Sequence, residues 1–254
     1  MTFIPNIAPR ALRNAWRQAR RTDSGLKRRV TKKLYDNFRG PLQSESKACF
    51  LESNENIEQI IAGVRPIPGD DILAICGSGD QAFALAEYGA RVYAVDNDPT
   101  QIAYASARAE MLKKGDFEGF LTYKRTRLMD HTITYFTGKG RLEGIRRNLD
   151  RVSFHNANIF HLPQELDMEY VKIYLSNAHQ YVRATRHKTI HNLMARLQRC
   201  GTVYAAAEIR QLEDCCGMSM RQEATTILRM RYGGIWYPTV YTKLAHTEWK
   251  EMVL

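Results

Sequence analysis

A short turn rich in glycine carries the first chemistry in this sequence. Gly77-Ser78-Gly79-Asp80 follows an apolar segment typical of a buried strand, and a helix-forming segment comes after it. Glycines at such a turn let the backbone approach a ligand closely, and the N-terminus of the following helix points at that ligand. Asp96 ends the next apolar segment, nineteen residues after Gly77. A carboxylate there accepts hydrogen bonds from both hydroxyls of a ribose, so the spacing predicts a nucleoside ligand.

The charge of the turn distinguishes between two nucleoside ligands. A dinucleotide such as NAD would place its pyrophosphate beside Asp80, and like charges at that distance repel each other. The turn also lacks the third glycine of the dinucleotide fingerprint. S-adenosylmethionine (SAM) instead carries a sulfonium and an ammonium, which a carboxylate attracts. We therefore expect SAM rather than NAD, with a domain of the same architecture that binds no ligand as the remaining alternative.

Two residues after the third apolar segment are suited to an adenine ring. Asn158 and Ile159 come directly after a segment with strand character at 152–157. The side-chain carbonyl of Asn158 can accept a hydrogen bond from the adenine amino group. Ile159 would lie on the face of the ring. The sequence thus predicts that the nucleoside extends toward this segment.

Polar residues also follow the fourth apolar segment, where Ser176, Asn177, His179 and Tyr181 are candidates for the reacting end of the site. The carboxyl ends of strands form the ligand crevice in open α/β sheets. His179 is a candidate general base, because histidine is the side chain suited to that role near neutral pH, although a single histidine more often only satisfies a hydrogen bond. Tyr181 would either hold the sulfonium by a cation–π contact or pack against the domain.

A parallel sheet is needed to bring these candidates together. The expected strands are 71–76, 91–96, 152–157, 171–175 and 201–207, and the expected helices include 81–88, 99–114 and 190–197. This alternation predicts an α/β fold with helices on both faces of a mostly parallel sheet. Residues 226–246 are rich in β-branched and aromatic types, which predicts a C-terminal antiparallel hairpin. An insertion at about 113–151 would shape a substrate pocket or add packing helices.

The positive charge of the chain is concentrated near its N-terminus. Residues 9–40 hold eleven Lys or Arg and two Asp, which accounts for nine of the ten net positive charges. Apolar residues there, among them Val30 and Leu34, recur at helical spacing. We expect a basic helical arm or lid at 1–41 and a SAM-binding, Rossmann-like catalytic domain at 42–254. The arm would pack on that domain as a lid, or contact anionic lipid, RNA or an acidic partner.

Composition limits the location and the metal content of the protein. No apolar stretch is long enough to cross a bilayer, and residues 1–5 are not followed by a signal region. We expect a cytoplasmic protein, with peripheral membrane contact through the arm as a further option. The five cysteines are odd in number and form no CxxC pair, so we expect reduced thiols and no metal. A metal held by Cys215-Cys216 and a histidine is the weak alternative.

Four short motifs add a resemblance to this interpretation. They are Gly77–Phe83, Asp96–Pro99 with Gln101, Asp116–Phe120 and Tyr174–Asn177, within roughly residues 45–210. They resemble the BtaA-like family of SAM-dependent 3-amino-3-carboxypropyltransferases, which includes enzymes of betaine-lipid synthesis. The resemblance implies a Rossmann-like class I SAM-dependent transferase fold. It also implies a SAM pocket lined by Gly77, Gly79, Asp80, Gln81, Asp96, Asn97, Asn158, Ser176 and Asn177. The chain departs from the lipid enzymes in its shorter length, and in carrying Phe50-Leu51-Glu52 near their tryptophan–acid pair.

The resemblance implies an enzyme that uses the aminocarboxypropyl group of SAM and releases methylthioadenosine. The acceptor would be a small molecule or a lipid, which is diacylglycerol in the lipid enzymes. A further option needs no acceptor: the amine of SAM would attack its own γ-carbon and close azetidine-2-carboxylate, with one of the four residues after the fourth strand keeping the amine neutral. The alternatives are a SAM-dependent methyltransferase of a small molecule or RNA, and a non-catalytic SAM- or nucleic-acid-binding protein. No DPPY or NPPY motif follows the fourth strand, which argues against methylation of a nucleic-acid amino group.

Overall fold

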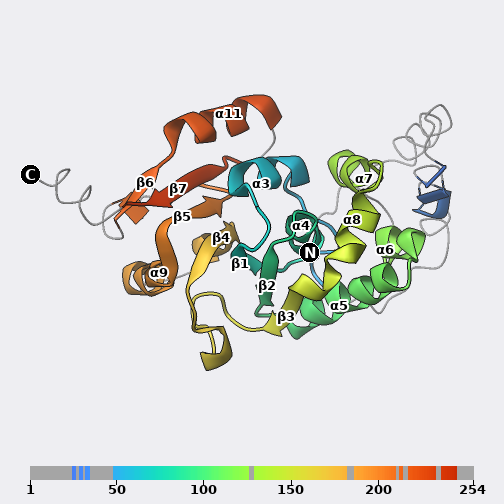
Figure 1. Ribbon diagram of the computed structural model, residues 1–254, viewed down its shortest axis with the longest axis horizontal. Helices are drawn as coiled ribbons and strands as arrows, with labels where there is room; N and C mark the ends of the chain where they lie inside the picture. The colour runs from blue at the N-terminus through green and yellow to red at the C-terminus, as the bar shows by residue number, and fades with distance from the viewer. Residues whose placement is uncertain are drawn as a thin grey trace, which may run out of the picture.

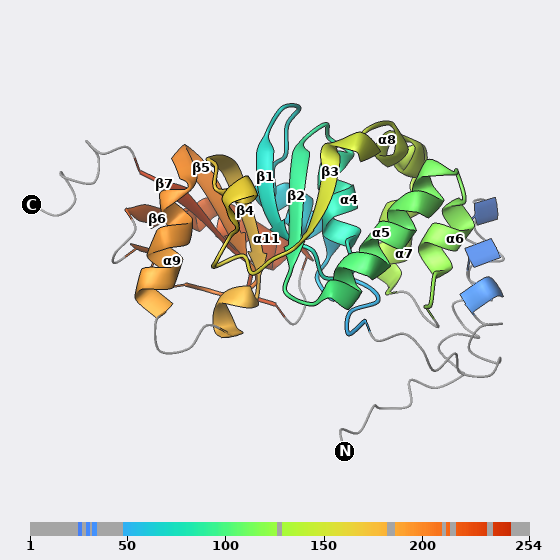
Figure 2. The same ribbon diagram turned by 90° about the horizontal axis from the view of Figure 1, so that it is seen from below.

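One twisted sheet with helices on both faces forms the body of the molecule (Figure 1; Figure 2). The computed structural model describes residues 25–26, 29–30, 32–34, 48–125, 129–181, 186–209, 212–213, 217–232 and 236–244. Within these segments the strands are β1 (Asp71–Ile75), β2 (Arg91–Asp96), β3 (Val152–Asn156), β4 (Tyr170–Ser176), β5 (Leu197–Ala205), β6 (Met218–Met220) and β7 (Thr239–Lys243).

The order of the strands defines the fold. Across the sheet the described strands run β3-β2-β1-β4-β5-β7-β6. Strands β1 to β5 pair in parallel, whereas β7 lies antiparallel to both β5 and β6. This is a mixed, mostly parallel sheet with an antiparallel strand near its edge, so the predicted Rossmann-like α/β fold is confirmed. The chain order runs outward in opposite directions from β1 and from β4, which makes the gap between their carboxyl ends the switch point of the sheet.

The helices pack on the two faces of the sheet, which separates the apolar core into two layers. They are α3 (Ile57–Val64), α4 (Asp80–Ala86), α5 (Pro99–Lys113), α6 (Phe117–Thr122), α7 (Asp130–Phe136), α8 (Arg141–Arg147), α9 (Arg186–Ala195) and α11 (Gln222–Tyr232), with 3₁₀ turns η1 (Leu149–Arg151), η2 (Gln164–Leu166) and η3 (Ala178–Tyr181). Successive side chains of a strand point to opposite faces of the sheet. In β1, Ile72 and Ala74 accordingly join the core with α3, α4 and α11, whereas Leu73 joins the core with α9.

Side-chain caps fix where two helices that border the site begin. The Asn56 side chain accepts the backbone N–H groups of Glu58 at 2.9 Å and Gln59 at 3.3 Å, which starts α3. Asp98 accepts the N–H of Thr100 at 2.8 Å, and Pro99 fills the first position of α5. Both caps satisfy N–H groups that the helices leave without an internal partner. The Asp98 cap sets α5 directly behind the end of β2.

The C-terminal edge of the sheet is antiparallel as predicted, but its connection is not a hairpin turn. Strands β6 and β7 form the edge, and helix α11 joins them. Residues 226–232, expected in the first strand, lie in α11. Thr225 and Leu228 are buried at helical spacing, and Leu228 belongs to the core that contains α3. Burial of this face overrides the preference of the β-branched residues for a strand.

The insertion after α5 forms packing helices α6, α7 and α8 on one face of the sheet. Phe120 and Phe136 are fully buried there, and their rings meet edge to face with centroids 5.4 Å apart. The interpretation as added packing helices is therefore correct. The same segment also supplies Arg125 to the buried ion cluster described below. Its role in shaping a substrate pocket stays a prediction.

Part of the N-terminal arm packs against the domain. Val30 and Leu34 are 0% and 2% exposed and join the main core. Arg29 and Lys33 lie 3.5 and 3.7 Å from the carboxylate of Glu118 in α6. These contacts support the lid interpretation for this segment, while residues 1–24 lie outside the described part of the chain.

Two further observations concern the membrane and metals. In the described residues no helix is both long and apolar enough to cross a bilayer. The same residues contain no group of three or more His, Cys, Asp or Glu side chains placed to hold a metal ion. The Cys215-Cys216 pair considered from the sequence lies outside the described residues.

Gly63 in α3 gives a test of how tightly this helix packs on the sheet. A Cβ at this position would come within 2.4 Å of the Tyr204 ring and 3.0 Å of Leu228. Overpacking of this kind typically costs about 1–3 kcal/mol, so Gly63→Ala is expected to lower the free energy of unfolding by that amount in urea titration. Gly144→Ala is the control, because its Cβ would find its nearest neighbour at an ordinary 3.4 Å. Equal stability of the two variants would contradict the packing.

Candidate functional site

The glycine turn lies at the carboxyl end of β1, beside the switch point of the sheet. Gly77 and Gly79 adopt positive φ values of 46° and 82°, a region that favours glycine. Gly79 also stands directly before α4, so the turn bends sharply from strand into helix. This conformation would allow the backbone of the turn to approach a ligand closely, as the sequence predicts.

Asp96 ends β2 next to this turn. One carboxylate oxygen accepts the backbone N–H of Gly77 at 2.9 Å, and the other accepts that of Asp98 at 3.0 Å. Burial raises the pKa of Asp96, although the N–H groups of Asp98 and Gly77 lower it in part. Each carboxylate oxygen retains a further lone pair for a hydroxyl donor. The side chain is therefore placed as a ribose-binding acid would be, against the turn and partly open to solvent.

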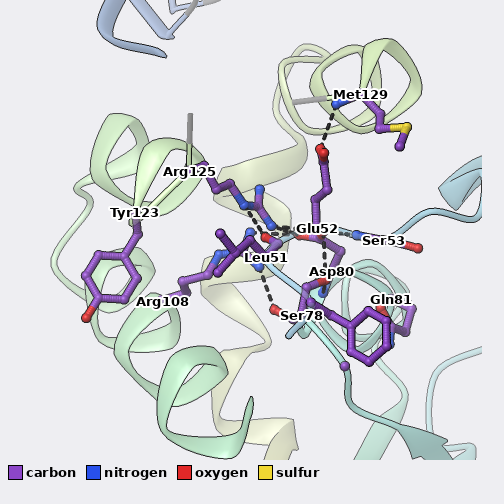
Figure 3. Close-up of polar contacts among 12 residues, drawn as sticks. Leu51, Glu52, Ser53, Ser78, Asp80, Gln81, Arg108, Tyr123, Arg125 and Met129 are labelled. Carbon is purple, nitrogen blue, oxygen red and sulfur yellow. Dashed lines mark hydrogen bonds and ion pairs between the residues drawn. The ribbon is translucent and has the colours of Figure 1, made fainter. Parts of the chain in front are cut away.

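Asp80 corrects a sequence-based expectation. Its carboxylate is fully buried and lies 2.7 Å from Arg108 and 3.0 Å from Arg125, whose side chains are also 0% exposed. Figure 3 shows both guanidinium groups converging on it. Burial alone would raise the pKa of Asp80, but the charges of Arg108 and Arg125 outweigh that effect and hold the pKa far below its usual range. The carboxylate is thus an ionised structural group and does not face a cationic ligand.

The loop formed by residues 50–55, called the 50–55 loop below, is tied to this buried carboxylate. The Ser53 N–H donates to Asp80 at 2.8 Å, and Arg125 Nε donates to the Leu51 carbonyl. The Gln101 side chain bonds both backbone groups of Phe50, at 2.8 and 2.9 Å. Its amide also donates to the Gly77 carbonyl at 2.7 Å. These bonds hold the loop against the glycine turn.

Ser78 and Gln81 serve the turn internally. The Ser78 hydroxyl donates to Asp80 at 2.9 Å, and Ser78 is 2% exposed. The Gln81 amide nitrogen donates to the carbonyls of Ile75 and Cys76 at 2.9 and 2.7 Å. The hydroxyl of Ser78 is therefore used within the protein, and a contact of Ser78 with the cofactor stays a prediction. The Oε1 atom of Gln81 is buried and finds no hydrogen-bond donor among the described residues, so it remains available to a ligand.

The predicted adenine-binding residues lie beyond β3. Asn158 is exposed, and its Oδ1 accepts the N–H of Phe160 at 2.9 Å in a tight turn. Ile159 is 3% exposed and belongs to the core that contains α9. Asn97, also expected near the ligand, is exposed immediately after Asp96. Contacts of these three residues with adenine or ribose stay predictions.

The residues after β4 separate into different environments. Ser176 has a positive φ of 50° at the end of the strand, Asn177 is half-buried, and His179 is buried in η3. Tyr181 is 74% exposed, so it does not pack in the core, which was one of the two roles expected for it. Its cation–π contact with a sulfonium stays a prediction. The catalytic roles of Ser176, Asn177 and His179 stay predictions.

Glu55 is a buried acid of the site that the sequence did not indicate. It is 2% exposed, and its Oε1 accepts the hydroxyls of Tyr174 at 2.7 Å and of Ser176. Burial raises its pKa, although the hydrogen bonds from Ser176 and Tyr174 lower it in part. No local pattern marks this residue, because both partners lie on β4, more than a hundred residues further along the chain.

Comparisons with known proteins concern the fold. No family model matches this sequence, and no curated protein matches it. Among solved structures, the [4+2]-cyclase SpnF is 11% identical over 85% of this chain and 93% of its own, with a TM-score of 0.49. TrmN from Thermus thermophilus is 18% identical over 78% and 51%, with a TM-score of 0.48. The magnesium protoporphyrin IX methyltransferase ChlM from Synechocystis PCC 6803, solved with bound SAM, is 13% identical over 91% and 90%, with a TM-score of 0.44.

Removing the charge of Asp80 tests the buried ion cluster. Asp80→Asn would leave two buried guanidinium groups without their counter-ion, which typically costs about 3–5 kcal/mol of unfolding free energy. Asp71→Asn is the control, because its partner Arg91 is exposed and such pairs contribute under about 1 kcal/mol. Chemical denaturation at pH 7 measures both variants. A loss for Asp80→Asn no larger than that of the control would contradict the role of the cluster.

The same cluster predicts a pH dependence. The pKa of Asp80 is lower in the folded than in the unfolded protein, so its contribution is fully present above the unfolded value of about 3.9. It is lost as the pH falls below that value. The stability difference between the wild type and Asp80→Asn is therefore expected to persist at pH 5 and to shrink only below about pH 4. A difference that vanished at pH 6 would show that another group dominates.

Proposed function

We propose that this chain is an enzyme that binds SAM at the glycine turn and uses its 3-amino-3-carboxypropyl group, releasing methylthioadenosine. The observation that carries the SAM site is the 2.9 Å hydrogen bond from Gly77 to the Asp96 carboxylate. It holds a partly buried acid against a glycine turn, at the switch point where α/β folds bind nucleosides. The Arg108 and Arg125 charges near the turn are already neutralised in part by Asp80, so a cationic ligand meets no free guanidinium of this cluster.

The choice of reaction depends on which carbon of SAM meets the nucleophile. The sulfonium activates three carbons, and an enzyme selects one by holding it about 3–3.5 Å from the attacking atom. The resemblance of Gly77–Phe83 and Tyr174–Asn177 to BtaA-like enzymes supports use of the aminocarboxypropyl arm. The acceptor is then a small molecule or a lipid, or the amine of SAM itself, which would close azetidine-2-carboxylate.

Methyl transfer to a small molecule or RNA is the second candidate function. It is favoured by the strand order, which is that of class I methyltransferases. The basic arm at 9–40 would serve either function by contacting anionic lipid or RNA. Burial of Val30 and Leu34 supports a lid for the part of the arm that the structure describes.

The nucleoside product distinguishes these functions. The protein is incubated with SAM alone, with SAM and diacylglycerol vesicles, and with SAM and a mixture of small amines. We expect methylthioadenosine by liquid chromatography and mass spectrometry, at a rate above that of SAM breakdown in buffer. Formation of S-adenosylhomocysteine in its place would overturn the proposed reaction and establish methyl transfer.

Asp96→Ala tests the nucleoside site independently of the reaction. The two ribose hydroxyls would lose a charged hydrogen-bond acceptor. Because hydrogen bonds to charged groups are strong, the affinity for S-adenosylhomocysteine should fall by at least about 100-fold. Isothermal titration calorimetry with S-adenosylhomocysteine measures the change, and a thermal melt checks that the variant is folded. The exposed Asp150 provides the control Asp150→Ala. Equal affinities for the two variants would refute the assignment.

A further inference from the structure

Glu55 lies at the carboxyl end of β4, beside the switch point of the sheet. Ser53, two residues earlier, donates its N–H to Asp80 at the start of α4. Glu55 itself contacts Ser176 at the carboxyl end of β4. The 50–55 loop therefore spans from the glycine turn after β1 to the end of β4. Those two strand ends border the crevice in which this fold binds its ligands.

One oxygen of this buried carboxylate has no partner. Oε1 is used by Tyr174 and Ser176, but Oε2 is buried and meets no hydrogen-bond donor in the part of the chain that the structure describes. The nearby Tyr204 hydroxyl is also buried and without a hydrogen-bond partner among those residues. Burial and the charge of Glu55 both raise the pKa of Tyr204, so the two groups interact. A buried acceptor left unsatisfied is costly, which indicates that a donor completes the site.

The backbone conformation of Ser176, which contacts Glu55, also points to a functional site at the end of β4. Its φ of 50° is unusual for a residue with a side chain, and it directs the hydroxyl onto Glu55. Strained backbone of this kind concentrates at functional sites. The strand end, the buried acid and the unpaired oxygen thus coincide at one point of the crevice.

We propose that Glu55 Oε2 binds the amino group of the aminocarboxypropyl tail of SAM. This inference rests on the proposed SAM site, because Asp96 would hold the ribose and the tail would then extend along the crevice toward β4. An ammonium supplies both the donor and the positive charge that a buried carboxylate lacks, and such charge-assisted hydrogen bonds are the strong ones. Burial raises the pKa of Glu55 in the free protein, and a bound ammonium would favour its ionised form.

A pair of ligands separates the tail from the nucleoside. S-adenosylhomocysteine carries the amino group, whereas methylthioadenosine has the same nucleoside and no amino acid tail. Glu55→Gln keeps the shape of the side chain and an Oε1 acceptor for Tyr174 and Ser176, but it removes the charge of the free oxygen. We expect calorimetry to show about 10- to 100-fold weaker binding of S-adenosylhomocysteine and less than about 2-fold change for methylthioadenosine.

Glu58→Gln is the matched control, since Glu58 is the exposed acid three residues further on. It should leave both affinities unchanged. Unchanged binding of S-adenosylhomocysteine to Glu55→Gln would overturn the proposal, and so would an equal loss for both ligands. Retained methylthioadenosine binding also reports that the variant is folded.

The wild type provides a second measurement that needs no variant. An analogue of S-adenosylhomocysteine with hydrogen in place of the amino group should bind about 10- to 100-fold more weakly than the parent. Equal affinity would overturn the role of Glu55. Failure of the proposed function has a different signature: a wild type that binds neither S-adenosylhomocysteine nor methylthioadenosine has no SAM site, whereas one that binds both and forms S-adenosylhomocysteine from SAM has the site but a different reaction.

Discussion

The buried carboxylate of Asp80 is the interaction on which the rest of the site depends. It joins Arg108 of α5, Arg125 after α6 and the backbone of Ser53, so helix, insertion and loop converge at the start of α4. A charge withdrawn from water is tolerated only when opposite charges and hydrogen-bond donors surround it closely. The ion pairs and hydrogen bonds to the Asp80 carboxylate therefore help to position the insertion and the 50–55 loop, in addition to apolar packing.

Two acids with different surroundings lie near the strand ends, Asp96 at the end of β2 and Glu55 beside the end of β4. Asp96 is partly open and held by backbone N–H groups, as suits an acceptor for neutral hydroxyls. Glu55 is enclosed and held by two side-chain hydroxyls, as suits a charged partner that replaces water. A ligand with a ribose at one end and an ammonium at the other matches this order. The fold supplies the first acid directly, whereas the second depends on the loop that Asp80 secures.

Local patterns were sufficient to predict the five parallel strands and the acid that ends β2. Strands β1 and β2 are short apolar segments with clear turns around them, and Asp96 follows from where β2 must stop. The interpretation of Asp80 failed because its partners stand 28 and 45 residues away, and no spacing rule connects them. Glu55 was missed for the same reason, since it meets Ser176 across 121 residues. At the C-terminus the antiparallel edge is confirmed, but the strand expected at 226–232 was wrong, because burial of Leu228 favoured a helix over the strand preference of the β-branched residues.

The ion cluster also constrains how this sequence can change over time. Loss of Asp80 leaves two buried guanidinium groups without a counter-ion. Loss of either arginine changes the net charge of a site from which water is excluded. A single replacement at any of these three positions would be destabilising, whereas joint changes that keep the charges and hydrogen bonds matched would cost less. Positions 80, 108 and 125 should therefore covary as a unit among relatives of this chain, and with them the length of the insertion that carries the third.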